Sequence, residues 1–155
     1  LMDPVEPVLA EIRRVLRPEG VFAAIVDGDM ETTPCYQRQH QIIYDWVRRD
    51  FPRYGAIDLG DPRVRKPAAL GELINDYFCE DQVMIEPSVV ELQGDPETLA
   101  RQAAGFFYAS FVLSPDSHAQ MLENLQQDFA ARCSGDGSGH SRFRMPINRL
   151  VVQSA

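Results

Sequence analysis

The sequence is poor in lysine, its arginines are mostly scattered, and it lacks the residue spacings with which proteins bind structural metals. Lysine occurs once, at Lys66, and the net charge is −8. Because phosphate binding needs clustered Lys and Arg, we expect no nucleic-acid partner. The cysteines at 35, 79 and 133 show no Cys-x-x-Cys spacing, and no histidine has metal-ligand spacing. We therefore expect neither a metal site nor a disulfide framework, and we expect a reducing, cytoplasmic compartment.

Long apolar runs are also missing. No run approaches the ~20 residues that a membrane span needs, so we expect no membrane association. The acidic, proline-rich start lacks a cationic segment, which predicts no signal peptide. With 155 residues, 45% of them hydrophobic, the chain is long enough for a packed core. The prediction is a single α/β domain over 1–155.

The segment over 8–26 predicts a helix, a tight turn and a buried strand. Asp3 and Pro4 are typical of a helix start, and Pro18 and Gly20 of the turn that ends it. The helix is expected over 3–16, because its apolar residues repeat at the helical period: Val5, Val8, Leu9, Ile12, Val15 and Leu16. The run over 21–26 is apolar without alternation. It favours a strand covered on both faces, as in a parallel sheet.

Further elements follow along the chain. Apolar periodicity and Asp-Pro or Ser-Pro starts predict helices over 34–49, 67–78, 96–113 and 115–132. Strands are expected over 83–92 and 141–153, and Pro87 favours an edge strand or a bulge for the first of these. The order is helix-strand-helix-helix-strand over 1–95, a helical insertion over 96–132, and a last strand.

Residues 11–22, Glu-Ile-Arg-Arg-Val-Leu-Arg-Pro-Glu-Gly-Val-Phe, carry a resemblance. They resemble the segment between the fourth and fifth strands of class I S-adenosylmethionine-dependent methyltransferases, with Glu19 where a first glycine is usual. In that family a seventh, antiparallel strand inserts between the fifth and sixth. The resemblance implies that the strands over 21–26, 83–92 and 141–153 are those three. The chain is then the C-terminal half of a Rossmann-like methyltransferase sheet, with a helical insertion.

The same resemblance implies where the cofactor binds. The family holds S-adenosylmethionine with a Gly-rich loop after its first strand and an acidic residue ending its second, and both would lie upstream of this sequence. Here only Leu1 and Met2 are expected near the cofactor, so this chain alone should bind it weakly or not at all and be inactive. The Gly135-to-Gly139 run has a similar spacing, but it follows a helix and precedes a strand, which favours a turn.

Candidate substrate-binding residues are of two kinds. Asp27 and Asp29 follow the strand over 21–26, at the edge where α/β proteins bind ligands, and are suited to orienting a hydroxyl or amine. Aromatic and histidine side chains are expected to line a small-molecule pocket: Tyr36, His40, Tyr44, Phe107 and Tyr108. For each, a capping, surface or core role is the alternative. No catalytic residue is identified, which is compatible with methyl transfer because that reaction depends mainly on positioning.

The function expected is therefore the C-terminal part of a methyltransferase acting on a small molecule. A non-catalytic binding or dimerisation module with the same half-fold is the alternative, and another Rossmann-like enzyme is a third. A strand over 21–26 without its usual neighbour has a bare apolar edge, which favours a homodimer or larger assembly that buries this edge or the apolar helices, such as the face of the helix over 3–16. The methyl acceptor is not encoded in any motif.

Overall fold

The computed structural model of the chain describes residues 4–52, 61–132 and 141–155. Contacts divide the chain into two compact units. Unit 1 comprises residues 1–29, 58–89 and 146–155, and unit 2 comprises residues 30–57 and 90–145. Each unit has its own hydrophobic core. The long strands β2 (Gln82–Gly94) and β3 (Ser141–Gln153) contribute to both.

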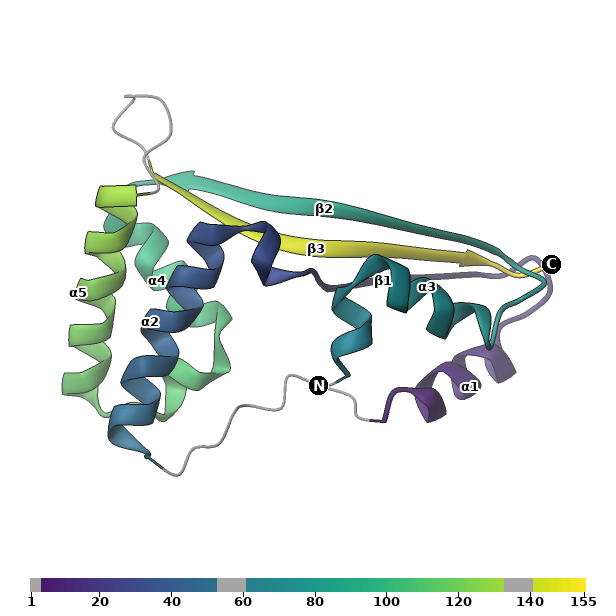
Figure 1. The fold of residues 1–155 in the computed structure, drawn as a ribbon, viewed down its shortest axis with the longest axis horizontal. Helices are drawn as coiled ribbons and strands as arrows, with labels where there is room; N and C mark the ends of the chain where they lie inside the picture. Colours follow the sequence, from purple (N-terminus) through teal and green to yellow (C-terminus); the bar gives the residue numbers. More distant parts are fainter. Residues whose placement is uncertain (1–3, 53–60, 133–140) are drawn as a thin grey trace. The chain divides into compact units, whose positions relative to one another are not determined.

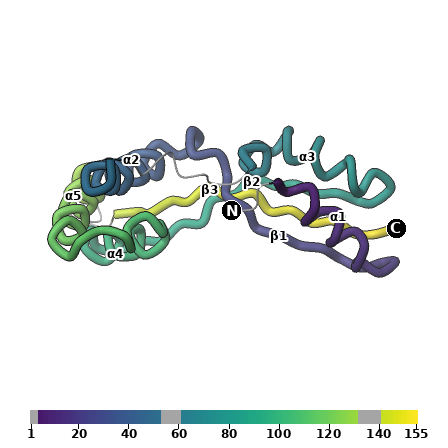
Figure 2. The backbone as a smooth tube through the Cα atoms, turned by 90° about the horizontal axis from the view of Figure 1, so that it is seen from below, coloured from purple at the N-terminus to yellow at the C-terminus, as the bar shows by residue number. Residues whose placement is uncertain are grey.

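Unit 1 consists of strands covered on one face by helices. Its elements are α1 (Glu6–Val15), β1 (Val21–Asp27), the 3₁₀ helix η2 (Pro62–Arg65), α3 (Pro67–Asn75) and parts of β2 and β3. Figures 1 and 2 show α1 and α3 on the same face of the strands. The core between them is apolar and includes Val5, Leu9, Leu70, Leu73, Ile74, Phe78, Leu150 and Val152.

The sheet has the strand order β1-β3-β2, so the last strand of the chain lies in the middle. β3 runs antiparallel to β1, and their register extends from Val21 opposite Gln153 to Asp27 opposite Ile147. The expected three strands, with the last one antiparallel and inserted between the other two, are confirmed. β2 is an edge strand, as Pro87 predicts. The chain is thus a mixed α/β protein with a three-stranded antiparallel sheet.

The expectation that the first strand is covered on both faces is wrong in this structure. Along β1, half-buried residues alternate with exposed ones. Phe22, Ala24 and Val26 pack on the helical side. On the opposite face Val21 is 59% and Ile25 72% exposed. A continuous apolar run therefore forms a strand with one apolar face that no described residue covers.

The start of α1 and the turn after it also differ from expectation. The helix begins at Glu6, with Val5 as N-cap and no side-chain cap, whereas Asp3 lies outside the described residues. Gly20 does make the turn, since its N–H donates to the carbonyl of Arg17 at 2.9 Å. A Cβ at Gly20 would lie 2.7 Å from that oxygen. The left-handed residue, however, is Glu19, with φ of 60°.

Unit 2 is mainly helical. It contains η1 (Met30–Thr32), α2 (Pro34–Asp50), α4 (Pro96–Phe106), η3 (Tyr108–Val112) and α5 (Pro115–Arg132). Figure 2 shows α2, α4 and α5 nearly end-on, so their axes run roughly alongside one another. The helix expected over 96–113 is shorter than predicted, because α4 ends at Phe106 and η3 follows it. The expected insertion packs with α2 around one core.

Candidate functional site

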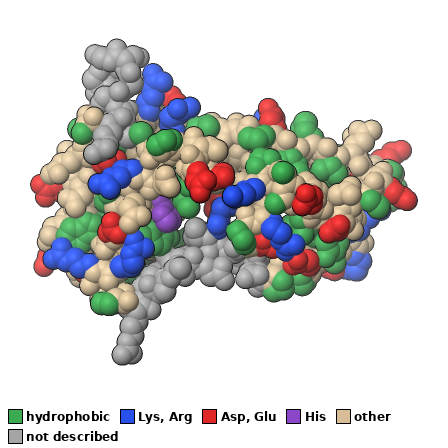
Figure 3. Space-filling model, in the orientation of Figure 1, with side chains coloured by type: hydrophobic (Ala, Val, Ile, Leu, Met, Phe, Trp, Pro, Cys, Tyr) green, Lys and Arg blue, Asp and Glu red, His purple; other side chains and the backbone are tan. Residues whose placement is uncertain are grey.

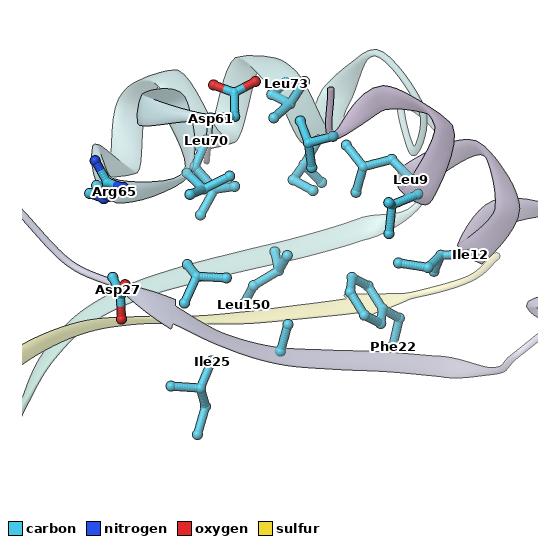
Figure 4. A pocket seen from close by; sticks show the side chains of 16 residues that line it. Leu9, Ile12, Phe22, Ile25, Asp27, Asp61, Arg65, Leu70, Leu73 and Leu150 are labelled. Atoms are coloured by element: carbon cyan, nitrogen blue, oxygen red, sulfur yellow. The ribbon is translucent and has the colours of Figure 1, made fainter. Parts of the chain in front are cut away.

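Unit 1 contains an apolar cavity of about 300 Å³ between its helices and its sheet. Figure 4 shows Leu9 and Ile12 of α1, Leu70 and Leu73 of α3, and Phe22 and Leu150 of the strands around it. Asp27, on the strand side, and Arg65, on the helical side, are both at the same end of it. Its volume falls at the low end of small-molecule sites, about 300–1,000 Å³, which are mostly apolar with a few polar groups. This cavity is the candidate binding site of unit 1.

The wall formed by η2 is fixed by two polar contacts. Asp61 caps η2, and its carboxylate accepts from the backbone N–H of Arg63 at 2.9 Å. Asn148 of β3, only 1% exposed, donates from its side-chain amide to the carbonyl oxygens of Val64 at 3.2 Å and Arg65 at 2.9 Å. Because both carbonyls find a donor on the central strand, η2 is held against the sheet next to the polar end of the cavity.

Arg63 joins two carboxylates at the rim. Its guanidinium Nε lies 3.0 Å from each carboxylate oxygen of Asp61, and it also pairs with Glu6 of α1. This guanidinium, assisted by the backbone N–H, holds the pKa of Asp61 below its ordinary value of 3.8. The same side chain lowers the pKa of Glu6. Asp61 is therefore an ionised, paired group in the rim at neutral pH.

The carboxyl end of β1 carries both predicted acidic residues. Asp27 is exposed and lines the cavity, and Asp29 follows as a half-buried residue that does not line it. Gly28 lies between them, and its N–H donates to the carbonyl of Pro146 at 2.9 Å. A Cβ at Gly28 would lie 2.8 Å from the backbone nitrogen of Ile147. The glycine is thus needed for close approach to β3.

That packing tests whether the chain fits S-adenosylmethionine. A cofactor loop of the family needs glycines that let the backbone approach the ligand. The space beside Gly28 is filled by β3 itself, and Gly94, which ends β2, is separated from α4 by Asp95 alone, which leaves no loop between strand and helix. The described residues therefore do not fit the cofactor by themselves. Leu1 and Met2, which were expected near it, lie outside the described residues.

Four of the predicted aromatic and histidine residues come together in unit 2. The rings of His40 and Tyr44 stack with centroids 4.1 Å apart, and Phe107 contacts both, with centroid distances of 5.5 Å and 6.5 Å. Tyr36 contacts Phe107 at 5.4 Å. Tyr36, Tyr44 and Phe107 are buried core residues. Their assignment as substrate-binding residues stays a prediction, and their contacts give them a packing role.

Tyr108 lies apart from this cluster. It is 73% exposed, whereas its neighbour Phe107 is 7% exposed. Phe106, Phe111 and Val112 are exposed as well. The aromatic segment is therefore divided, with Phe107 packed in the core of unit 2 and the other large side chains exposed.

Sequence reasoning missed most of the cavity lining. The sequence predicts no helix or strand between 49 and 67, yet Asp61, Val64 and Arg65 of this segment line the cavity. The Asp61-Pro62 pair carries the same cap-and-proline signature that located the start of α4 at Asp95 and Pro96. Applied to residue 61, it would have found η2. Ala24 and Leu150 lie in the strands predicted over 21–26 and 141–153, and nothing in their sequence context distinguishes core from cavity wall.

Charged side chains of both signs are interspersed on the face drawn in Figure 3. In the described part of the chain, no group of three or more His, Cys, Asp and Glu side chains could hold a metal ion. Every helix within residues 4–52, 61–132 and 141–155 is too short or too polar to span a bilayer.

Comparison with known proteins adds no assignment. No protein-family model matches the chain, and no curated protein matches it. Any function for this chain is therefore argued from its own residues, its sheet and its cavity.

Proposed function

We propose that the chain is the C-terminal portion of an S-adenosylmethionine-dependent methyltransferase that acts on a small molecule. The observation that carries this proposal is the strand order β1-β3-β2, with β3 antiparallel to β1. In the resembling family the last strand inserts between the fifth and sixth in the same way. The order matters because two strands adjacent in the chain would more commonly pair directly.

The turn into β1 supports the same family. Glu19 adopts φ of 60°, a conformation that favours glycine, and the family usually carries glycine at this position. Gly20 is required by its close approach to the carbonyl of Arg17. The two positions after Pro18 thus have separate backbone requirements: a left-handed conformation at residue 19 and a close approach to another residue's backbone at Gly20.

The uncovered surface of unit 1 supports the view that further chain packs here. In the described residues β1 has β3 as its one neighbouring strand, so its other edge carries unpaired backbone groups. The face opposite the helices exposes Val21 and Ile25. An additional strand on that edge and helices on that face would bury both. In the proposed enzyme they belong to the portion that binds the cofactor.

In this proposal S-adenosylmethionine supplies the methyl group and is held by that other portion. The described residues supply a water-excluding wall for the acceptor, formed by the cavity, with Asp27 positioned to orient the polar group of the acceptor. The chain alone is inactive. The proposal includes a cytoplasmic protein without nucleic-acid or membrane partners.

The alternative function is a non-catalytic binding or dimerisation module. The same unpaired edge of β1 favours it, because two copies can pair antiparallel there. With Ala24 opposite Ala24 of the second copy, all seven residues of β1 pair, and Phe22 faces Val26. A homodimer formed this way joins the two sheets into one of six strands. Sedimentation of the chain at high micromolar concentration tests it, with Ile25→Lys as the variant that weakens the dimer. A clean monomer excludes this alternative.

Methyl transfer itself tests the proposed enzyme. Radiolabelled S-adenosylmethionine is incubated with a panel of small acceptors and either this chain or a form extended upstream in its reading frame. The proposal predicts transfer by the extended form alone. Absence of transfer by both, together with a dimer in sedimentation, favours the alternative.

A further inference from the structure

We infer that the cavity of unit 1 is a binding site for a small, uncharged hydrocarbon body such as an alkyl-substituted aromatic ring. Burial of this body, without a hydrogen bond to the ligand, carries the affinity. The inference deepens the proposed function, in which the apolar body belongs to the methyl acceptor. Only that naming of the ligand rests on the proposed function. The binding itself rests on the lining of the cavity.

The body of the cavity is lined by apolar side chains from both layers of unit 1. Leu9 of α1 and Leu70 and Leu73 of α3 lie on the helical side, and Phe22 and Leu150 lie on the strand side (Figure 4). The four leucines are almost fully buried, so the core of unit 1 fixes these walls. Their side chains offer no hydrogen-bond partner, whereas a buried water needs several. A hydrocarbon gains dispersion contacts there and leaves water at the same time.

The charged residues of the lining are satisfied without a ligand. The carboxylate of Asp61 accepts from the backbone N–H and the guanidinium of Arg63. The backbone carbonyl of Arg65 accepts from Asn148 at 2.9 Å, and Arg65 has a further interaction within the protein. Asp27 is exposed, so solvent hydrates its carboxylate. A polar group on a buried ligand would therefore lose its own hydration without a matching gain.

Phe22 favours a ligand that contains a ring. It supplies an aromatic side chain to the lining, and its ring is stacked on that of Phe78 with centroids 6.5 Å apart. That contact holds the ring in place, and aromatic pairs attract one another beyond the area they bury. The volume of about 300 Å³ limits the ligand to a small molecule. An alkylbenzene is therefore the simplest probe of the site.

The experiment uses nuclear magnetic resonance of the isotopically labelled chain, titrated with the alkylbenzenes from benzene to hexylbenzene. The expected result is saturable shifts of the amides of Ala24, Val64 and Leu150. Affinity should rise about fourfold for each added methylene and stop rising at the length that fills the cavity. Shifts that do not saturate, or an affinity that rises through the whole series, would mean adsorption on exposed apolar surface and overturn the inference.

Ligands of matched size test the absence of a hydrogen bond. Phenol carries a hydroxyl where toluene carries a methyl group, and benzylamine carries an ammonium where ethylbenzene carries a methyl group. Each hydrocarbon is expected to bind at least about tenfold more tightly than its polar counterpart, because burial of an unpaired polar group is unfavourable. Equal or tighter binding of phenol or benzylamine contradicts a site that selects a hydrocarbon.

Two neighbouring alanines supply a matched pair of variants. Ala24 lines the cavity, whereas Ala23 lies on the opposite, exposed face of β1. Ala24→Leu fills the space and is expected to weaken propylbenzene binding at least about tenfold, while Ala23→Leu leaves it unchanged. Should Ala24→Leu fail to fold, Ile12→Phe fills the cavity from α1. Unchanged binding in the cavity-filling variant, or equal loss in the Ala23 variant, contradicts the assignment of the site.

A widened cavity gives the opposite test. Ile12 of α1 lines the cavity and is half-buried, so Ile12→Ala enlarges the space from the helical side. The length at which affinity stops rising should then increase by at least one methylene. An unchanged limit in Ile12→Ala would contradict a bounded cavity at this place.

These titrations are separate from the methyl-transfer assay. None includes the cofactor, and the alkylbenzenes carry no heteroatom that accepts a methyl group. Saturable binding without methyl transfer by any form of the chain supports the site and removes the proposed function. Methyl transfer without alkylbenzene binding supports the proposed function and removes the site.

Discussion

The side-chain amide of Asn148 donates a hydrogen bond of 2.9 Å to the backbone carbonyl of Arg65. A residue of the central strand, fully buried, thereby fixes the backbone of the residue that marks the polar end of the cavity. The amide also donates to the carbonyl of Val64 at 3.2 Å. The contact connects β3, near the end of the chain, with η2 more than eighty residues earlier, and it makes the cavity wall depend on one side chain.

Replacement of Asn148 by Ala should therefore destabilise unit 1 and loosen η2. Loss of a buried donor leaves carbonyl oxygens unsatisfied, so we expect the free energy of unfolding to fall by about 1–3 kcal/mol. Urea denaturation measures it. Gln153→Ala, at the exposed end of the same strand, is the control and should change stability by less than about 0.5 kcal/mol. Equal effects of the two changes would contradict the anchoring role of Asn148.

Glu19 and Gly20 offer adjacent changes with opposite signs. The left-handed conformation of Glu19 costs a residue other than glycine about 1–2 kcal/mol, and Glu19→Gly removes this cost. Part of the gain in stability is lost, because glycine has more conformational freedom in the unfolded chain. The net expectation is stabilisation by about 0.5–1 kcal/mol. Gly20→Ala places a Cβ 2.7 Å from the carbonyl of Arg17 and should destabilise. Thermal unfolding of both variants checks the pair, and destabilisation by Glu19→Gly would contradict the turn geometry.

Stability in acid should depend on Asp61. Its pKa is lowered in the folded state by Arg63, so the unfolded chain binds more protons as the pH falls below 3.8. The contribution of Asp61 is thus fully present above that pH and is lost as the pH falls through the folded-state value. Asp61→Asn keeps a capping side chain but removes the charge. Unfolding measured across the acid range should show a weaker pH dependence in this variant, while Asp116→Asn serves as the control carboxylate.

The aromatic segment predicts a second contrast. Phe107 packs against the rings of Tyr36, His40 and Tyr44, so Phe107→Ala should cost about 3–5 kcal/mol through the cavity it leaves. Tyr108 is 73% exposed, and Tyr108→Ala should change stability by less than about 0.5 kcal/mol. Chemical denaturation compares them. A large loss in the Tyr108 variant would mean that this side chain is covered in solution.

Much of the fold was predictable because its information is local. The turn at residues 17–20, the cap at Asp95 and the apolar period of α2 each involve neighbours in sequence, and each locates an element in the structure. The position of β3 between β1 and β2 came from the family resemblance, since no local pattern fixes which strands pair. The continuous apolar run over 21–26 led to a wrong prediction for β1. Such a run indicates a strand buried on both faces, whereas the described residues cover β1 on one face only.

The candidate site was less predictable for the same reason. The sequence identified His40 and Tyr44 of α2 as candidate residues because of their spacing along the helix. Their contact with Phe107, however, depends on how α4 packs. The cavity is formed by residues from five elements, and its polar end joins the end of β1 to η2. Only tertiary packing brings Asp27 and Arg65 to the same end of the cavity, so sequence spacing gave no indication of it.

The central claim is that this chain is one portion of an enzyme whose cofactor is held by the other. Calorimetric titration with S-adenosylhomocysteine, of this chain beside a form extended upstream to include any Gly-rich loop, tests it most directly. The account predicts binding by the extended form and none by this chain. Tight one-to-one binding by this chain alone, or no binding by either form, would contradict it.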